Sequence, residues 1–135
     1  MTSTCREPCC AAPRMTVSEL LERGLRRRRE PMPAAQAPDC ADAAGNSARF
    51  ALALAGDRIG AIGFRATTCA TLIAYCEWLA ETVPGQRVAL AAALTPRDLI
   101  DAVPGVPPLK RERAVLAVAA FRAALADLAT PMEAT

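Results

Sequence analysis

The sequence predicts an α+β domain in which a small antiparallel sheet of two or three strands packs against several helices. Apolar residues alternate along 49–55 and 59–66, which is the periodicity of strands. Elsewhere they recur every three or four residues, which is the spacing of helices. Neighbouring strands followed by a run of helices are typical of α+β folds.

The 135 residues suffice for one domain with a core, rather than for two domains. Residues 1–14 hold three of the six cysteines among prolines and alanines, without a helical pattern, and we expect a disordered tail there. These cysteines are Cys5, Cys9 and Cys10. A single domain is expected over 15–135, and one hypothesis is that Met15, where a helical pattern begins, is the true initiator.

The stretch 17–29 predicts the first helix, with Thr16 or Ser18 as its cap. It ends in four arginines, 26–29, which form either a solvated helix end or a docking patch for an acidic partner. Prolines then end the helix, and we expect a loop over 30–47 that contains Cys40.

The strand over 49–55 is predicted to form a hairpin with the next strand through Gly56-Asp57. Thr67-Thr68 supplies hydroxyls for a helix cap, and helical spacing follows from Cys69 to 83. Cys69 is thus interpreted as a first-turn residue of a helix, where the positive helix end lowers a thiol pKa. A small buried thiol remains the alternative. Cys76 lies on the apolar stripe and is interpreted as structural.

The remaining chain is predicted to be helical. A short turn over 88–94 precedes a helix that begins at Thr95-Pro96, where a cap is followed by proline. Three prolines make a rigid connection, and 109–129 is the last helix, with an apolar stripe broad enough to close the core.

Composition excludes several functions. The chain has no histidine, which removes Ser-His-Asp catalysis and Cys/His zinc fingers. The net charge of +2 and an arginine run without interleaved aromatics do not indicate nucleic-acid binding.

No membrane span or signal peptide is visible, so we expect a cytoplasmic protein. No phosphate loop or nucleophile–base pair is present, and we expect neither a catalytic residue nor an enzyme.

Four stretches resemble one family in their order and spacing. They are 18–31, the Ala44-Gly45-Asn46 tripeptide before a strand, 64–79, and 94–125 with Leu-Thr-Pro-Arg-Asp-Leu-Ile and Val-Pro-Gly-Val-Pro-Pro-Leu-Lys. Over about residues 15–129 the chain resembles the NifU/IscU-type iron–sulfur cluster assembly scaffold domain. The resemblance implies iron binding and a [2Fe–2S] cluster at three cysteines and an aspartate. It also implies a cysteine desulfurase, acceptor proteins and chaperones as partners.

Only one family ligand is retained, as Cys69. Ala44 stands where the first cysteine is expected, Asn46 where the aspartate is expected, and Arg113 where the last cysteine is expected. Cys40, four residues before Ala44, is the second candidate ligand for iron or a cluster. The candidate oxygen ligands are Glu112, Asp39 and Asp42.

Arg113 changes the chemistry that the resemblance implies. A cation near Cys69 stabilises its thiolate and repels ferrous iron, which suits sulfur better than metal. The predicted function is therefore an assembly scaffold-like protein that accepts sulfur or a labile [2Fe–2S] cluster at Cys69. The alternative is a degenerate interaction module that docks on a cysteine desulfurase or another assembly partner.

Overall fold

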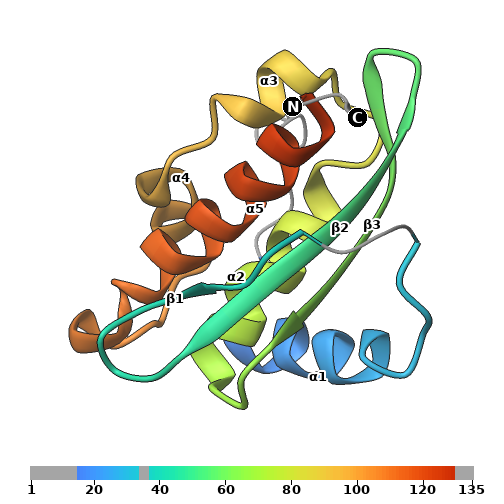
Figure 1. The fold of residues 1–135 in the computed structure, drawn as a ribbon. Coiled ribbons are helices and arrows are strands. Elements are labelled where there is room, and N and C mark those ends of the chain that lie inside the picture. Colours follow the sequence, from blue (N-terminus) through green and yellow to red (C-terminus); the bar gives the residue numbers. More distant parts are fainter. Residues whose placement is uncertain (1–14, 34–36, 130–135) are drawn as a thin grey trace, which may run out of the picture.

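The computed structural model describes residues 15–33 and 37–129, so the predicted tail over 1–14 lies outside the described residues. Figure 1 shows a small sheet packed against helices, which confirms the predicted α+β class. The elements in chain order are α1 (Val17–Arg27), β1 (Cys40–Ala41), β2 (Ser47–Ala55), β3 (Arg58–Ala66), α2 (Ala70–Thr82), α3 (Val88–Ala92), α4 (Pro96–Ala102), the 3-10 turn η3 (Pro108–Lys110) and α5 (Arg113–Ala129).

The three strands are antiparallel and follow the order β1-β2-β3. Cys40 pairs with Ala48, which pairs in turn with Ala66, so these residues form one row across the sheet. The β2–β3 hairpin turns at Gly56, whose φ of +67° is a conformation that glycine adopts without strain. β1 lies within the stretch that was expected to be a loop, and its two residues are too few to show strand periodicity.

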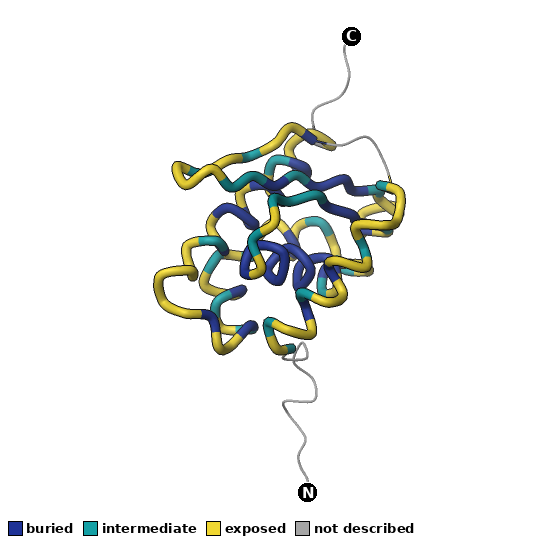
Figure 2. Tube along the Cα trace, turned by 90° about the horizontal axis from the view of Figure 1, so that it is seen from below, coloured by how far each residue is buried: buried dark blue, intermediate teal, exposed yellow. Residues whose placement is uncertain are grey.

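Helix α2 forms the centre of the molecule. All ten residues from 71 to 80 are buried, and Figure 2 shows this dark blue helix in the helix layer beside the sheet. Helices α1 and α5 both pack against α2, and α5 also covers β2. Phe50 of β2 lies with its ring centroid 5.8 Å from that of Phe64 and 5.7 Å from that of Phe121. The sheet and the helices therefore share one core.

Helix α1 approaches α2 very closely at Gly24. A Cβ atom placed on Gly24 would lie 2.5 Å from Cγ2 of Ile73, a distance that real Cβ atoms do not reach. This approach brings Arg27 to Glu77, where Nε and Nη2 donate to the two carboxylate oxygens at 2.7 and 2.9 Å. The carboxylate side chain of Glu77 is fully buried, so this ion pair joins the two helices inside the molecule.

The arginine run at the end of α1 is divided by this pairing. Arg27 points inward, whereas the other three arginines are exposed. They are Arg26, Arg28 and Arg29. The run therefore combines one structural arginine with an exposed group, and only the exposed group is suited to docking.

The C-terminal third follows the expected pattern with one shift. Thr95 caps α4 through a capping box with Asp98, as its sequence indicates. The last helix begins at Arg113 instead of 109, because two prolines lead into the separate turn η3. Among the described residues, no helix combines the length and apolar character that a membrane crossing requires.

Candidate functional site

Cys69 lies at the junction of β3 and α2 and is the N-cap residue of the helix. Its extended backbone (φ −127°, ψ 115°) differs from the predicted first-turn position by one residue. Thr67 does not cap the helix, because its Oγ1 accepts from the Ser47 amide at 3.2 Å and donates to Asn46 Oδ1 at 3.4 Å. The Cys69 sulfur therefore sits at the positive end of α2, with the β1–β2 turn beside it.

The Cys69 thiol is half-buried and acidified. Partial burial by itself would raise the pKa of this thiol. Hydrogen bonding from the backbone amide of Leu72 and from the Arg113 guanidinium outweighs that effect, so the net pKa is lowered from its ordinary value. This environment favours a reactive thiolate over the inert buried thiol that the sequence left open.

Arg113 is the first residue of α5, and its side chain is 11% exposed. Its Nη1 donates to Glu112 Oε2 at 2.8 Å and lies 3.9 Å from Asp42 Oδ2. The guanidinium is thus held between carboxylates and the Cys69 sulfur. This arrangement connects the start of α5 to the N-terminal end of α2.

Asp42 is fixed by the turn between β1 and β2. Its Oδ1 accepts from the backbone amides of Ala44 and Asn46, both at 3.0 Å. Partial burial opposes the ionised form, but these hydrogen bonds and the charge of Arg113 lower the pKa of Asp42 overall. The turn that carries two ligand positions in the resemblance therefore presents a fixed negative charge to Arg113.

Ala44 and Asn46, which stand where the resemblance implies a cysteine and an aspartate, are not arranged to bind a metal. Ala44 is exposed and has no side-chain donor atom for a metal. The side chain of Asn46 donates through Nδ2 to Asp42 Oδ2 at 3.3 Å, while its Oδ1 accepts from Thr67. These contacts hold the turn against the end of β3.

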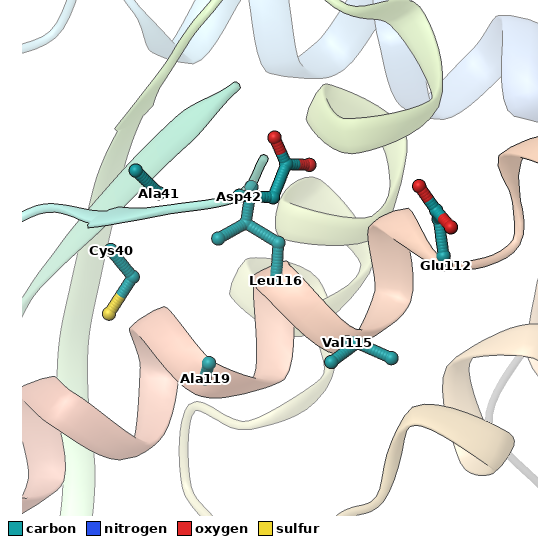
Figure 3. Close-up of a pocket in the computed structure, with 7 residues that line it drawn as sticks. All are labelled: Cys40, Ala41, Asp42, Glu112, Val115, Leu116 and Ala119. Carbon is teal, nitrogen blue, oxygen red and sulfur yellow. The ribbon is translucent and has the colours of Figure 1, made fainter. Parts of the chain in front are cut away.

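Cys40 lines a cavity of about 330 Å³ between β1 and α5. Figure 3 shows its sulfur directed toward α5 near Ala119, while Asp42, just after β1, and Glu112, just before α5, lie toward the other end of the cavity. The rest of the wall is formed by Ala41, Val115 and Leu116. The cavity is therefore apolar around the thiol and acidic toward Arg113.

The sheet register places β2 between Cys40 and β3, the strand that leads to Cys69. The row from Cys40 through Ala48 to Ala66 spans two strand spacings, or about 10 Å, and Cys69 lies three residues beyond Ala66. Joint iron or cluster binding by these two cysteines stays a prediction.

Other candidate ligands are engaged elsewhere. Asp39 accepts from Arg49 Nη1 at 3.2 Å, and Glu112 pairs with Arg113. Within 15–33 and 37–129, no three Cys, Asp, Glu or His side chains are grouped so that they could hold a metal ion. Cys76 is fully buried, and burial raises its pKa, in agreement with a structural role.

The sequence indicated that Arg113 would lie near Cys69, but it did not indicate how Asp42 is placed. Asp42 was considered only as an oxygen ligand, whereas it contacts the guanidinium. A signal was present, because an aspartate two residues before Ala44 and four before Asn46 is typical of turns in which the side chain accepts backbone amides.

Comparison with known proteins gives the family. The family model described as NifU-like N terminal domain matches residues 22–133. The bifunctional protein NifU/MnmA of Rubrobacter xylanophilus is 37% identical over 87 residues, which is 63% of this chain and 18% of that relative. The chain thus corresponds to less than a fifth of the length of this relative. The match over most of the described domain shows that the chain belongs to the NifU-like N-terminal domain family.

Proposed function

We propose that this domain serves iron–sulfur cluster assembly as a scaffold-like protein that accepts sulfur at Cys69. Family membership supports the general role. The finer proposal depends on one observation, the Arg113 guanidinium beside a half-buried thiol at a helix N-terminus. A fixed cation favours the anionic forms of sulfur and opposes the approach of ferrous iron.

The side chains around Cys69 do not fit a conventional cluster with four protein ligands. Arg113 stands where the last cysteine is expected, and the nearby carboxylates of Asp42 and Glu112 are directed to it. Asn46 is used within the turn. A labile cluster at Cys69 stays a prediction, which anaerobic reconstitution with iron and sulfide checks through visible absorption and iron content.

The sulfur step needs only a persulfide donor. The Cys69 thiolate attacks the outer sulfur of the donor persulfide, and a new S–S bond forms as the donor S–S bond breaks. The donor leaves as a thiolate that takes up a proton, and Cys69 becomes a persulfide. The sulfur atom moves with no net oxidation or reduction, so no further reagent is required.

The proposed donor is a cysteine desulfurase, and the proposed receivers are acceptor or chaperone proteins of cluster assembly. A second candidate function, docking on such a partner without chemistry, is favoured by the three exposed arginines at the end of α1. If docking is the whole function, replacing Cys69 by serine leaves the function of the protein intact.

The decisive experiment incubates the full chain with a cysteine desulfurase and cysteine, and locates added sulfur by peptide-resolved mass spectrometry. We expect sulfur on Cys69 in the wild type and in the matched Cys40→Ser control, and none at this position in Cys69→Ser. Absence of sulfur on Cys69 in the wild type, or loading that is confined to Cys40, contradicts the proposal.

A further inference from the structure

The Nε atom of Arg113 is buried and has no hydrogen-bond partner among the described residues. The opposite side of the same guanidinium is well satisfied, because Nη1 donates to Glu112 and faces Asp42. Buried N–H donors without a hydrogen-bond acceptor are uncommon in native proteins, so this one indicates that an acceptor is missing. Here the donor belongs to the group that already acts on the Cys69 sulfur.

The shape of the guanidinium indicates what kind of acceptor fits. Its five N–H groups lie in one plane and form a fixed fork that binds two acceptor atoms side by side. The Cys69 thiolate offers one acceptor atom. A persulfide at the same residue offers a second sulfur about 2 Å farther out, on a site where Arg113 already lies against the first.

We propose that Nε–H of Arg113 binds the sulfur atom transferred to Cys69, so that this arginine holds the persulfide as well as the thiolate. The ligand class is the anionic outer sulfur of a protein persulfide. This inference rests on the proposed function and extends it, because it assigns a place to the cargo. The bound outer sulfur is then shielded from attack by thiols that do not belong to an acceptor.

Replacing Arg113 by lysine separates its two proposed roles, which are to stabilise the Cys69 thiolate by charge and to bind the outer sulfur through Nε–H. Arg113→Lys keeps a positive charge near Cys69 but removes the fork and its Nε–H. We therefore expect the Cys69 thiolate to remain reactive in this variant, while the Cys69 persulfide is lost about tenfold faster to an added thiol, because a charge-assisted hydrogen bond is missing. Arg111→Lys is the matched control, since Arg111 is an exposed cation two residues earlier in the chain.

The experiment loads the full chain with cysteine persulfide, adds dithiothreitol, and follows sulfur on Cys69 by peptide-resolved mass spectrometry. Iodoacetamide reactivity of the unloaded protein reports the thiolate, and circular dichroism reports the fold. Faster loss in Arg113→Lys than in Arg111→Lys, with similar iodoacetamide reactivity, supports the inference. Equal persistence of the persulfide in both variants overturns it.

If Arg113→Lys does not fold, Arg113→Gln tests the same inference. Arg113→Gln lacks the charged guanidinium fork and its Nε–H, and we expect a similarly short-lived persulfide. A wild-type lifetime in this variant overturns the inference. The outcomes also separate the two proposals. A wild type that takes no sulfur on Cys69 contradicts the proposed function, whereas normal loading with unchanged persistence in the variants contradicts only the role of Nε.

Discussion

Two places on helix α2 carry a cysteine with an arginine nearby, and they differ in almost every physical respect. At the N-terminal end, Cys69 is half-buried and faces Arg113 from α5. In the middle, Cys76 is fully buried, and the adjacent Glu77 pairs with Arg27 from α1. The pKa of the first thiol is lowered, and burial raises that of the second.

The difference shows that the position along the helix decides the direction in which the pKa of each thiol shifts. The end of α2 has free amides that stabilise a thiolate, whereas the middle has only packed side chains around the sulfur. The arginines differ accordingly. Arg27 compensates a buried carboxylate, while Arg113 is shared between partly exposed carboxylates and the Cys69 sulfur.

The largest expected effect is the difference in alkylation between the two thiols. In the native protein, iodoacetamide should modify Cys69 at least about a thousandfold faster than Cys76, because Cys76 reacts only when the core around α2 opens. Peptide-resolved mass spectrometry of a time course measures both rates. In urea the rates should converge, and comparable rates in the native protein would show that the middle of α2 is not sealed.

The next effect concerns the arginine in the middle. Arg27→Ala should lower the free energy of unfolding by about 3 kcal/mol near neutral pH, because it leaves the buried Glu77 carboxyl without its cation. Urea denaturation measures the change. Arg28→Ala is the matched control on an exposed position, where a change within about 0.5 kcal/mol is expected. Equal losses in both variants would remove the distinction drawn within the arginine run.

A smaller effect follows from the protonation of Glu77. Burial, opposed by Arg27, raises the pKa of Glu77 from 4.5 to about 7. Between these values the folded protein keeps a proton that the unfolded chain has lost, so the contribution of this carboxyl to stability falls as pH rises. Urea midpoints across this pH range measure the slope. Glu77→Gln should remove this contribution and exposed Glu22→Gln should retain it; an unchanged slope in Glu77→Gln contradicts the assignment.

The smallest effect is expected at the N-terminal end. Arg113→Gln should slow alkylation of Cys69 near neutral pH by about fivefold, because loss of the guanidinium raises the thiol pKa. The rate profile should shift to higher pH by a corresponding amount. Arg111→Gln serves as the control, and a Cys69 profile that shifts equally in both variants would mean that general surface charge, not contact with Arg113, acidifies this thiol.

Most of the fold could be predicted because local patterns determine it. Alternation identified the strands of the hairpin, and Thr95-Pro96 identified the start of α4. The inward turn of Arg27 could not be read from its own neighbourhood, since its partner lies 50 residues away. A usable signal was the matching spacing of four residues between Arg23 and Arg27 on α1 and between Glu77 and Glu81 on α2.

The surroundings of Cys69 could be predicted in part for the same reason. The junction of strand and helix at Cys69 is a local feature, so its sequence revealed it. The role of Asp42 depends on a turn and on the first residue of α5, which meet only in the folded chain. Short β1 likewise owes its existence to pairing with β2.

The missing side chain of Gly24 has one consequence for how this family member can vary. Because Gly24 has no side chain, Cγ2 of Ile73 on α2 packs directly against the backbone of α1. Arg27 lies three residues further along α1 and pairs with Glu77 across the same contact between the two helices. A larger side chain at position 24 or 73 should therefore push α1 and α2 apart. Such a substitution should lengthen the Arg27–Glu77 ion pair as well as disturb the packing of the two helices.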